Sequence, residues 1–240
     1  MTMLEYRRIY FTLGFVYSVL LMFFPLYGTQ RPSNHNYLIV GSIFCAEVTI
    51  CLVFSRKQFL RHVLLLIFLT LIPLNLLFGL DKQINTMFAI VALNFWLSRD
   101  NSALFFLLSR FSVFIGYLFA GLNKLASHNF LNGEILRPYF EEKLPSFLGL
   151  HHGLDILAFS IAIAEITLSL LILSRFRYSW ICVVILHLGM ATLLSTGYSS
   201  FFDLAIFGAL MLFGALPIER SMTSVGGKAQ VPSALPQRHD

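Results

Sequence analysis

Residues 103–122 read ALFFLLSRFSVFIGYLFAGL, a run of 20 residues in which Arg110 is the only charged side chain. About 20 apolar residues let a helix cross the hydrocarbon of a bilayer, and the run lacks the period-two alternation of a membrane strand. Similar runs recur along the chain, which is 57% hydrophobic and 12% charged, against roughly 25% charged in soluble domains. Since backbone polar groups in lipid are satisfied only in helices or closed barrels, the sequence predicts an all-α integral membrane protein.

The apolar runs predict about eight transmembrane helices in one polytopic domain, residues 1–216. The predicted spans are residues 9–27, 37–54, 62–80, 84–97, 103–122, 155–173, 179–195 and 201–216. Residues 123–152 are too polar to cross the bilayer and too aromatic for a solvated linker. We therefore expect them to lie in the membrane interface as a loop or helix. Residues 217–240 are predicted to form a disordered cytoplasmic tail.

The distribution of basic residues predicts the orientation. With a cytoplasmic N-terminus, eleven Lys and Arg residues lie on the cytoplasmic side and five on the outer side, as the positive-inside rule requires. Both termini are then cytoplasmic, and we expect a multi-pass protein of a bacterial inner (plasma) membrane. The net charge of +5 does not indicate nucleic acid, because the basic residues flank apolar runs. The expected partners are the lipid bilayer and a membrane or periplasmic protein or peptide.

Two of the predicted spans contain similar short segments. Residues 46–52 read AEVTICL and residues 164–170 read AEITLSL. A match between the second and sixth spans would make the domain two parallel four-helix repeats. A single matched segment also arises by chance among apolar helices, so both interpretations stay open.

Four ionisable side chains stand out within the predicted spans: Arg110, Glu47, Glu165 and His187. Such groups cost roughly 2.5 to 3.5 kcal/mol on insertion scales, so each needs a reason. In a structural interpretation, Arg110 pairs with one glutamate and His187 bonds a hydroxyl such as that of Thr167. In a functional one, they form a polar pocket or a proton relay, which keeps a proton-coupled transporter among the alternatives.

The fifth span carries a polar face made of residues at steps of four and three: Arg110, Phe114, Tyr117, Gly121 and Lys124. Such a face does not suit lipid, so it is predicted to look into the bundle or a cavity, with Lys124 at the outer mouth. An ordinary interfacial lysine that extends its ammonium to the headgroups is the alternative.

No metal site is expected. His128, His151 and His152 lie in the predicted outer segment without a carboxylate at ligand spacing. The three cysteines fall inside apolar runs and form no C-x-x-C pair.

The residues around Lys124 resemble a known family. Residues 117–125 read YLFAGLNKL and are followed by Phe130 and Gly133, while Glu165 and His187 lie in later apolar runs. Over residues 60–215 this pattern resembles the horizontally transferred transmembrane (HTTM) domain, the membrane part of vitamin K-dependent γ-carboxylase and its bacterial relatives. A more distant similarity links the chain to DoxX-like quinone-associated proteins.

The resemblance implies that Lys124 is the base that handles a reduced quinone at an outward-facing pocket. We therefore expect a quinone-dependent, carboxylase-like or redox-coupled membrane enzyme in which Tyr117 and His187 position a quinone-like ring and Glu165 orients His187. The expected catalytic residues are Lys124, His187 and Glu165, and the expected cofactor-binding residues are Tyr117, Gly121, Arg110 and Phe130. A non-catalytic accessory subunit that scaffolds a partner through residues 123–152 is the alternative.

The chain also departs from the carboxylases. Asn85 stands where they have a histidine, and the sequence offers no large lumenal domain to grip a propeptide. Protein γ-carboxylation is therefore not expected. Action on a small lipid-soluble quinone, or maturation of a secreted peptide together with a partner, fits the length better.

Overall fold

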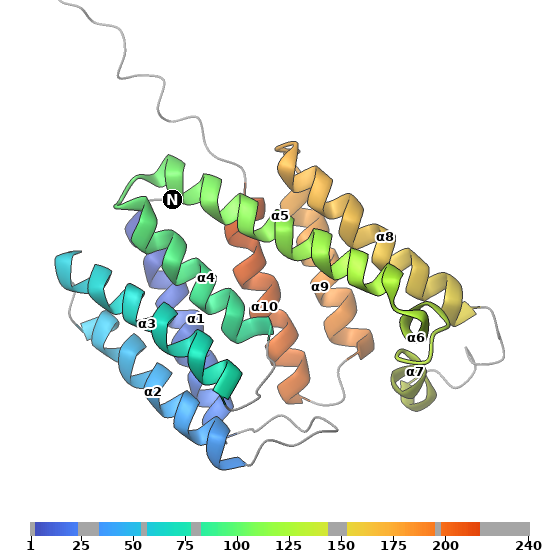
Figure 1. Cartoon of the computed structure of the whole chain (residues 1–240), viewed down its shortest axis with the longest axis horizontal. Helices are drawn as coiled ribbons and strands as arrows, with labels where there is room; N and C mark the ends of the chain where they lie inside the picture. The colour runs from blue at the N-terminus through green and yellow to red at the C-terminus, as the bar shows by residue number, and fades with distance from the viewer. Residues whose placement is uncertain are drawn as a thin grey trace, which may run out of the picture.

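The computed structural model describes residues 3–23, 34–53, 57–77, 83–143, 153–194 and 198–216. Within these ranges the chain forms ten helices and no strand (Figure 1). Their bounds are α1 Met3–Phe23, α2 Asn34–Val53, α3 Lys57–Leu77, α4 Gln83–Ser98, α5 Ser102–Ala126, α6 His128–Leu131, α7 Arg137–Lys143, α8 Gly153–Leu173, α9 Ser179–Leu194 and α10 Tyr198–Ala215. The all-α prediction is confirmed, and each of the eight apolar runs forms one helix. The predicted tail, residues 217–240, lies outside the described residues.

Two helices, α5 and α8, are long and apolar enough to cross a membrane by length and composition. In five others the apolar part is shorter: Leu38–Cys51, Phe59–Leu74, Ile84–Ser98, Ser179–Leu193 and Leu204–Ala215. Polar residues explain part of the difference, since α3 for example begins with Lys57-Gln58 and carries Arg61-His62 in its second turn. The eight-span topology therefore stays a prediction.

The helices pack mainly as neighbours along the chain, with α1 on α2, α3 on α4, α5 on α8, and α9 on α10 (Figure 1). The first and second halves meet through α4 on α5 and through α10 on α1 and α4. Since α5 also packs on α10, the three helices α4, α5 and α10 form the centre of the molecule.

Two buried tyrosines fix α1 against α4. The Tyr10 hydroxyl donates to the Phe88 carbonyl oxygen at 2.8 Å, and the Tyr17 hydroxyl donates to Asn85 Oδ1 at 2.7 Å. Tyr10, Tyr17 and Phe88 are all fully buried. Asn85, the position compared above with a carboxylase histidine, therefore serves the packing of the first half.

The first turns of α1 are helical, although the predicted span starts only at residue 9. Arg7 is buried and forms an ion pair with Asp100, in the turn between α4 and α5. Its guanidinium carbon also lies 5.8 Å from the centroid of the Phe95 ring. A charged residue that hydropathy assigns to the flank is thus part of the helical bundle.

The segment between α5 and α8 is structured where it is described. The short helices α6 and α7 form a small second core in which Phe130, Leu136 and Phe140 pack with Leu154 and Ala158 of α8. Of the predicted interfacial segment, the described residues 127–143 contain the short helices α6 and α7, and residues 144–152 lie outside the described residues. Its placement in a membrane interface stays a prediction.

Candidate ligand pocket

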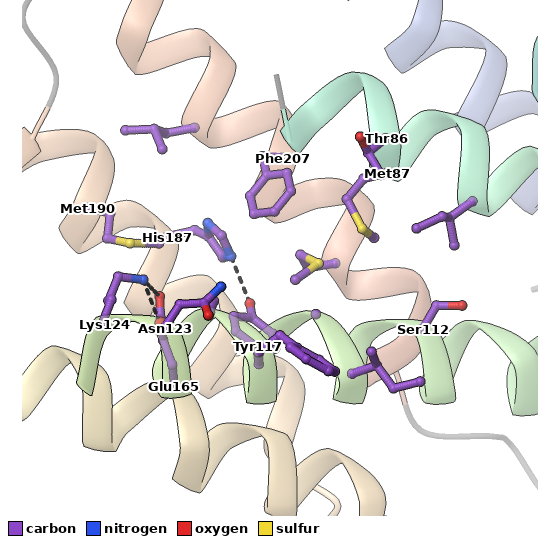
Figure 2. A pocket seen from close by; sticks show the side chains of 17 residues that line it. Thr86, Met87, Ser112, Tyr117, Asn123, Lys124, Glu165, His187, Met190 and Phe207 are labelled. Carbon is purple, nitrogen blue, oxygen red and sulfur yellow. Dashed lines mark hydrogen bonds and ion pairs between the residues drawn. The ribbon is translucent and has the colours of Figure 1, made fainter. Parts of the chain in front are cut away.

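A pocket of about 380 Å³ lies between α4, α5, α9 and α10, with one residue contributed by α8 (Figure 2). Its apolar lining consists of Met87, Ile90, Ile115, Phe119, Met190, Leu204, Phe207 and Met211, together with Gly116 and Ala120. Its polar lining consists of Thr86, Ser112, Tyr117, Asn123, Lys124, Glu165 and His187. A mostly apolar wall with a few convergent polar groups is typical of small-molecule sites of this size.

An ion pair between α5 and α8 closes one end of the pocket (Figure 2). Lys124, in the last turn of α5, donates from Nζ to both carboxylate oxygens of Glu165, at 2.6 and 2.5 Å. The Glu165 side chain is 4% exposed and the Lys124 side chain 26%. The ammonium also lies 5.7 Å from the centroid of the Phe130 ring, within reach of a cation–π attraction. Because Glu165 is withdrawn from water, Lys124 is the group that balances its charge.

A second polar contact joins α5 to α9. Tyr117 Oη lies 2.7 Å from His187 Nε2, and both side chains are buried. The other ring nitrogen, His187 Nδ1, is buried without a hydrogen-bond partner among the described residues. The imidazole meets the Phe207 ring edge to face, with centroids 5.3 Å apart. Since buried polar atoms are normally satisfied, Nδ1 is an atom that a bound molecule could engage.

Two glycines allow the close helix packing that sets up these contacts. A Cβ at Gly121 would lie 2.6 Å from Ile166 Cγ1 and 2.8 Å from the Ala162 carbonyl oxygen, both in α8. A Cβ at Gly208 in α10 would lie 2.7 Å from His187 Cβ. Small residues at such contacts let helix backbones approach closely, which here brings α8 to α5 and α10 to α9 beside the polar groups.

Four of the predicted site residues, Tyr117, Lys124, Glu165 and His187, come together in the pocket. Their pairing differs from the expected one. Glu165 was expected to orient His187, and the structural interpretation gave His187 a partner such as Thr167. Both expectations are wrong, because the Glu165 carboxylate binds Lys124 and the Tyr117 hydroxyl binds Nε2 of His187.

The other three predicted residues, Gly121, Arg110 and Phe130, are not among the residues that line the pocket. Gly121 packs on α8, and Phe130 belongs to the small core that α6 and α7 form with α8. Arg110 is buried on α5, and the expected ion pair with a glutamate is not formed. The glutamates are engaged elsewhere, since Glu165 binds Lys124 and Glu47 accepts a hydrogen bond from Thr70 at 2.9 Å.

Sequence reasoning missed the walls supplied by α4 and α10. Thr86, Met87, Phe207 and Met211 are ordinary residues of apolar helices, and nothing in their spacing marks them as pocket residues. Asn123 could have been predicted to line the pocket, because it directly precedes Lys124 in the motif of residues 117–125. Of the histidines considered as metal ligands, His151 and His152 lie outside the described residues.

Comparison of the chain with protein-family models, with curated proteins and with solved structures gave no match. The resemblance to the HTTM domain therefore stays a prediction, and the function is argued from the geometry of the pocket.

Replacing Tyr117 by phenylalanine removes only the hydroxyl that meets His187. We expect the free energy of unfolding to fall by about 1 to 2 kcal/mol, because the buried Nε2 loses its partner. Denaturant titration of the purified protein measures the change. Phe111, exposed on the same helix, gives the control, and Phe111→Leu should change the stability little. A Tyr117→Phe variant as stable as the parent protein would contradict the contact.

Proposed function

We propose that the chain is a multi-pass membrane protein whose pocket binds a lipid-soluble, quinone-like molecule, with Lys124 as the base. The observation that carries the proposal is the clustering of Lys124, Glu165, Tyr117 and His187 on the wall of an otherwise apolar pocket. Apolar lining suits a ring and chain that partition into lipid, and the polar groups suit ring oxygens.

The distribution of polar and apolar side chains supports a membrane setting. Charged and polar residues lie inside the bundle, among them Arg7, Glu47, Asn94, Arg110, Glu165 and His187. Large apolar side chains lie outside, among them Leu76 (78% exposed), Leu77 (77%), Ile156 (66%) and Ile185 (66%). A soluble protein shows the opposite preference, whereas intramembrane ionisable groups face a bundle interior. On this basis we propose that all eight long helices cross, with both termini cytoplasmic in a bacterial inner membrane.

Two helices of the proposed bundle are short. Both α4 and α9 have 16 residues, which corresponds to about 24 Å of helix at 1.5 Å per residue. A hydrocarbon core is about 30 Å thick. Local bilayer thinning beside these helices accommodates the difference at modest cost.

The ion pair supplies a route for the proton. In the mostly apolar pocket the Lys124 ammonium passes one proton to the Glu165 carboxylate, which leaves a neutral amine and a neutral acid. The amine then accepts the proton of a ligand hydroxyl, and the ligand becomes the oxyanion beside the restored ammonium. Positioned proton acceptors of this kind are the usual basis of general-base catalysis. Tyr117 and His187 hold the ligand ring by hydrogen bonds, for which Nδ1 is free of other partners among the described residues.

Binding of a short-chain naphthoquinone and of its reduced, hydroquinone form tests this proposal. We expect the protein in lipid nanodiscs to bind the reduced form, and Lys124→Met to weaken that binding by about tenfold or more, since a charge-assisted hydrogen bond contributes roughly 1.5 kcal/mol or more. Arg137→Met removes an exposed cation of α7 and should leave the affinity unchanged. Equal binding of the reduced form by the Lys124→Met and parent proteins would refute the role of Lys124.

A peptide or periplasmic partner, if present, would meet the α6–α7 segment, which lies next to the pocket through the contact of Phe130 with Lys124. Co-purification in mild detergent tests this part of the proposal. A partner that is lost when α7 is altered by Arg137→Glu would support it, and isolation of the chain alone would count against it.

The packing of α1 on α2 supports the repeat interpretation, which we also propose. A Cβ at Gly14 would lie 3.1 Å from Val48 in α2, and a Cβ at Gly121 lies closest to Ile166 in α8. Val48 and Ile166 occupy the same place in the matched segments 46–52 and 164–170. With the two glycines superposed, Tyr17 takes the place of Lys124. The first half of the chain would thus repeat the second, with the buried Tyr17 at the position that Lys124 occupies in the second half.

A further inference from the structure

A second cavity, of about 540 Å³, lies between α8 and α9 and shares no residue with the pocket. Ile163, Thr167 and Leu171 of α8 and Cys182, Ile185 and Leu186 of α9 belong to its lining, which also reaches Phe159. From Phe159 to Leu171 the groove follows α8 for about 18 Å, at 1.5 Å per residue. Several lining side chains are well exposed, including Ile185 at 66%. The cavity is therefore a long apolar groove on the outside of the bundle.

The groove ends at the turn between α8 and α9. Leu171 and Cys182 line that end, and Arg175 and Arg177 lie between them in the chain, both exposed. Neither arginine forms an ion pair with any part of the chain that the structure describes. Two exposed cations without a carboxylate partner among the described residues thus lie in the turn that follows the end of the groove.

Exposed aromatic side chains surround the two arginines. Phe176 is 45% exposed, Tyr178 50% and Trp180 37%, and the Arg177 guanidinium carbon lies 5.6 Å from the centroid of the Tyr178 ring. Aromatic and basic residues gathered at one end of apolar helices are typical of the level of lipid headgroups.

Arg110 adds a third cation near this turn. Gly121 of α5 packs against Ala162 and Ile166 of α8. The start of α8 lies by α6, which follows the end of α5, so α5 and α8 run antiparallel (Figure 1). Arg110, eleven residues before Gly121, therefore lies at the level of the end of α8. Its side chain is 7% exposed, and Nε is buried with no hydrogen-bond partner among the described residues.

We propose that this face binds one anionic phospholipid, with its phosphate at Arg175 and Arg177 and an acyl chain in the α8–α9 groove. Guanidinium groups match the geometry of phosphate oxygens, and an uncompensated positive turn complements an anionic headgroup. Basic sites beside membrane helices bind anionic lipids in this manner. The buried charge of Arg110 strengthens the positive potential at the turn.

Lipid binding to the purified full chain tests the proposal. Delipidated protein in mild detergent is titrated with phosphatidylglycerol, with phosphatidylcholine of the same chain length, and with inorganic phosphate, and bound lipid is counted by native mass spectrometry. The Arg175→Gln/Arg177→Gln double variant should bind phosphatidylglycerol roughly tenfold to thirtyfold more weakly, from about 1 kcal/mol for each basic residue at a lipid surface. Phosphatidylcholine should bind weakly to both proteins.

The matched control is the Arg8→Gln/Arg99→Gln double variant, which removes the same charge from two exposed arginines at the same end of the bundle. It should bind phosphatidylglycerol as the parent does. An equal loss in this control would show general surface attraction and overturn the proposal. Binding of inorganic phosphate as strong as that of the lipid would also overturn it, because the groove would then contribute nothing.

Alkylation of Cys182 reports on the groove itself. Phosphatidylglycerol should slow the reaction of Cys182 with N-ethylmaleimide several-fold, whereas Cys45 in α2 is the internal control and should react at an unchanged rate. Ala164→Trp, which places a large side chain in the groove, should remove the protection. Protection of both cysteines alike, or of neither, would refute occupation of the groove.

Discussion

Replacement of Lys124 by methionine should lower the free energy of unfolding by about 3 kcal/mol, the lower end of the range for removing one partner of a buried ion pair. Glu165 keeps both carboxylate oxygens on the Lys124 ammonium, and its side chain is only 4% exposed. We expect the lower end of this range of destabilisation because the Lys124 side chain is 26% exposed. In the variant, solvent can therefore reach this end of the site and recover part of the lost free energy. Reversible unfolding in mixed detergent micelles measures the effect.

A second substitution separates the ion pair from other effects of the lysine. In the double variant Lys124→Met/Glu165→Leu no buried charge remains, so most of the lost stability should return. Arg137→Met, an exposed cation on α7, should change the stability by less than about 0.5 kcal/mol. The single variant Glu165→Leu completes the comparison. If the double variant loses as much stability as Lys124→Met and Glu165→Leu lose together, the two side chains do not act as a pair.

Replacement of Gly121 by valine should destabilise the protein by about 3 kcal/mol, the upper end for overpacking. Its Cβ would lie 2.8 Å from the Ala162 carbonyl oxygen, and a backbone atom of a helix cannot move aside alone. The helices α5 and α8 would have to separate, which also draws Lys124 away from Glu165. The expected readouts are a lower thermal midpoint and weaker binding of the reduced naphthoquinone.

Gly189 in α9 provides the matched control, since a Cβ there meets nothing within 4 Å. Gly189→Val should leave the thermal midpoint and ligand binding nearly unchanged. Should Gly121→Val be tolerated equally well, the close approach of α5 to α8 would be wrong, and so would the geometry of the Lys124–Glu165 pair.

Hydropathy was sufficient to predict where the eight long helices lie, but not where each of them begins and ends. The runs of apolar residues placed eight helices correctly because each run is uniform enough to exclude other secondary structure. The start of α1 was missed, since Tyr6 and Arg7 belong to the bundle only through partners far along the chain such as Asp100. A window of hydropathy cannot register a contact between residues 93 positions apart.

The residues of the site were easier to predict than their partners. Glu165, His187 and Lys124 stand out because ionisable groups are rare among apolar residues, and the helical spacing places Tyr117 on the face of Lys124. Which group meets which depends on the register of α5 against α8 and α9. The absence of a side chain at Gly121 decides how closely α5 packs on α8, and its absence at Gly208 decides how closely α10 packs on α9 at His187. The expected roles of these residues in binding or catalysis stay predictions.

The polar groups of the pocket are unevenly distributed. Ser112 is already satisfied, since it donates to the Leu108 carbonyl oxygen at 2.9 Å and accepts from Asn94 at 3.1 Å. Lys124 in α5 and His187 in α9, whose Nδ1 has no hydrogen-bond partner among the described residues, lie away from Ser112 (Figure 2). A molecule with one polar and one apolar end should therefore fit in a single direction. In the membrane orientation proposed above, the proton that such a ligand gives up at Lys124 would be taken up at one end of the pocket, and thus nearer to one face of the bilayer than to the other.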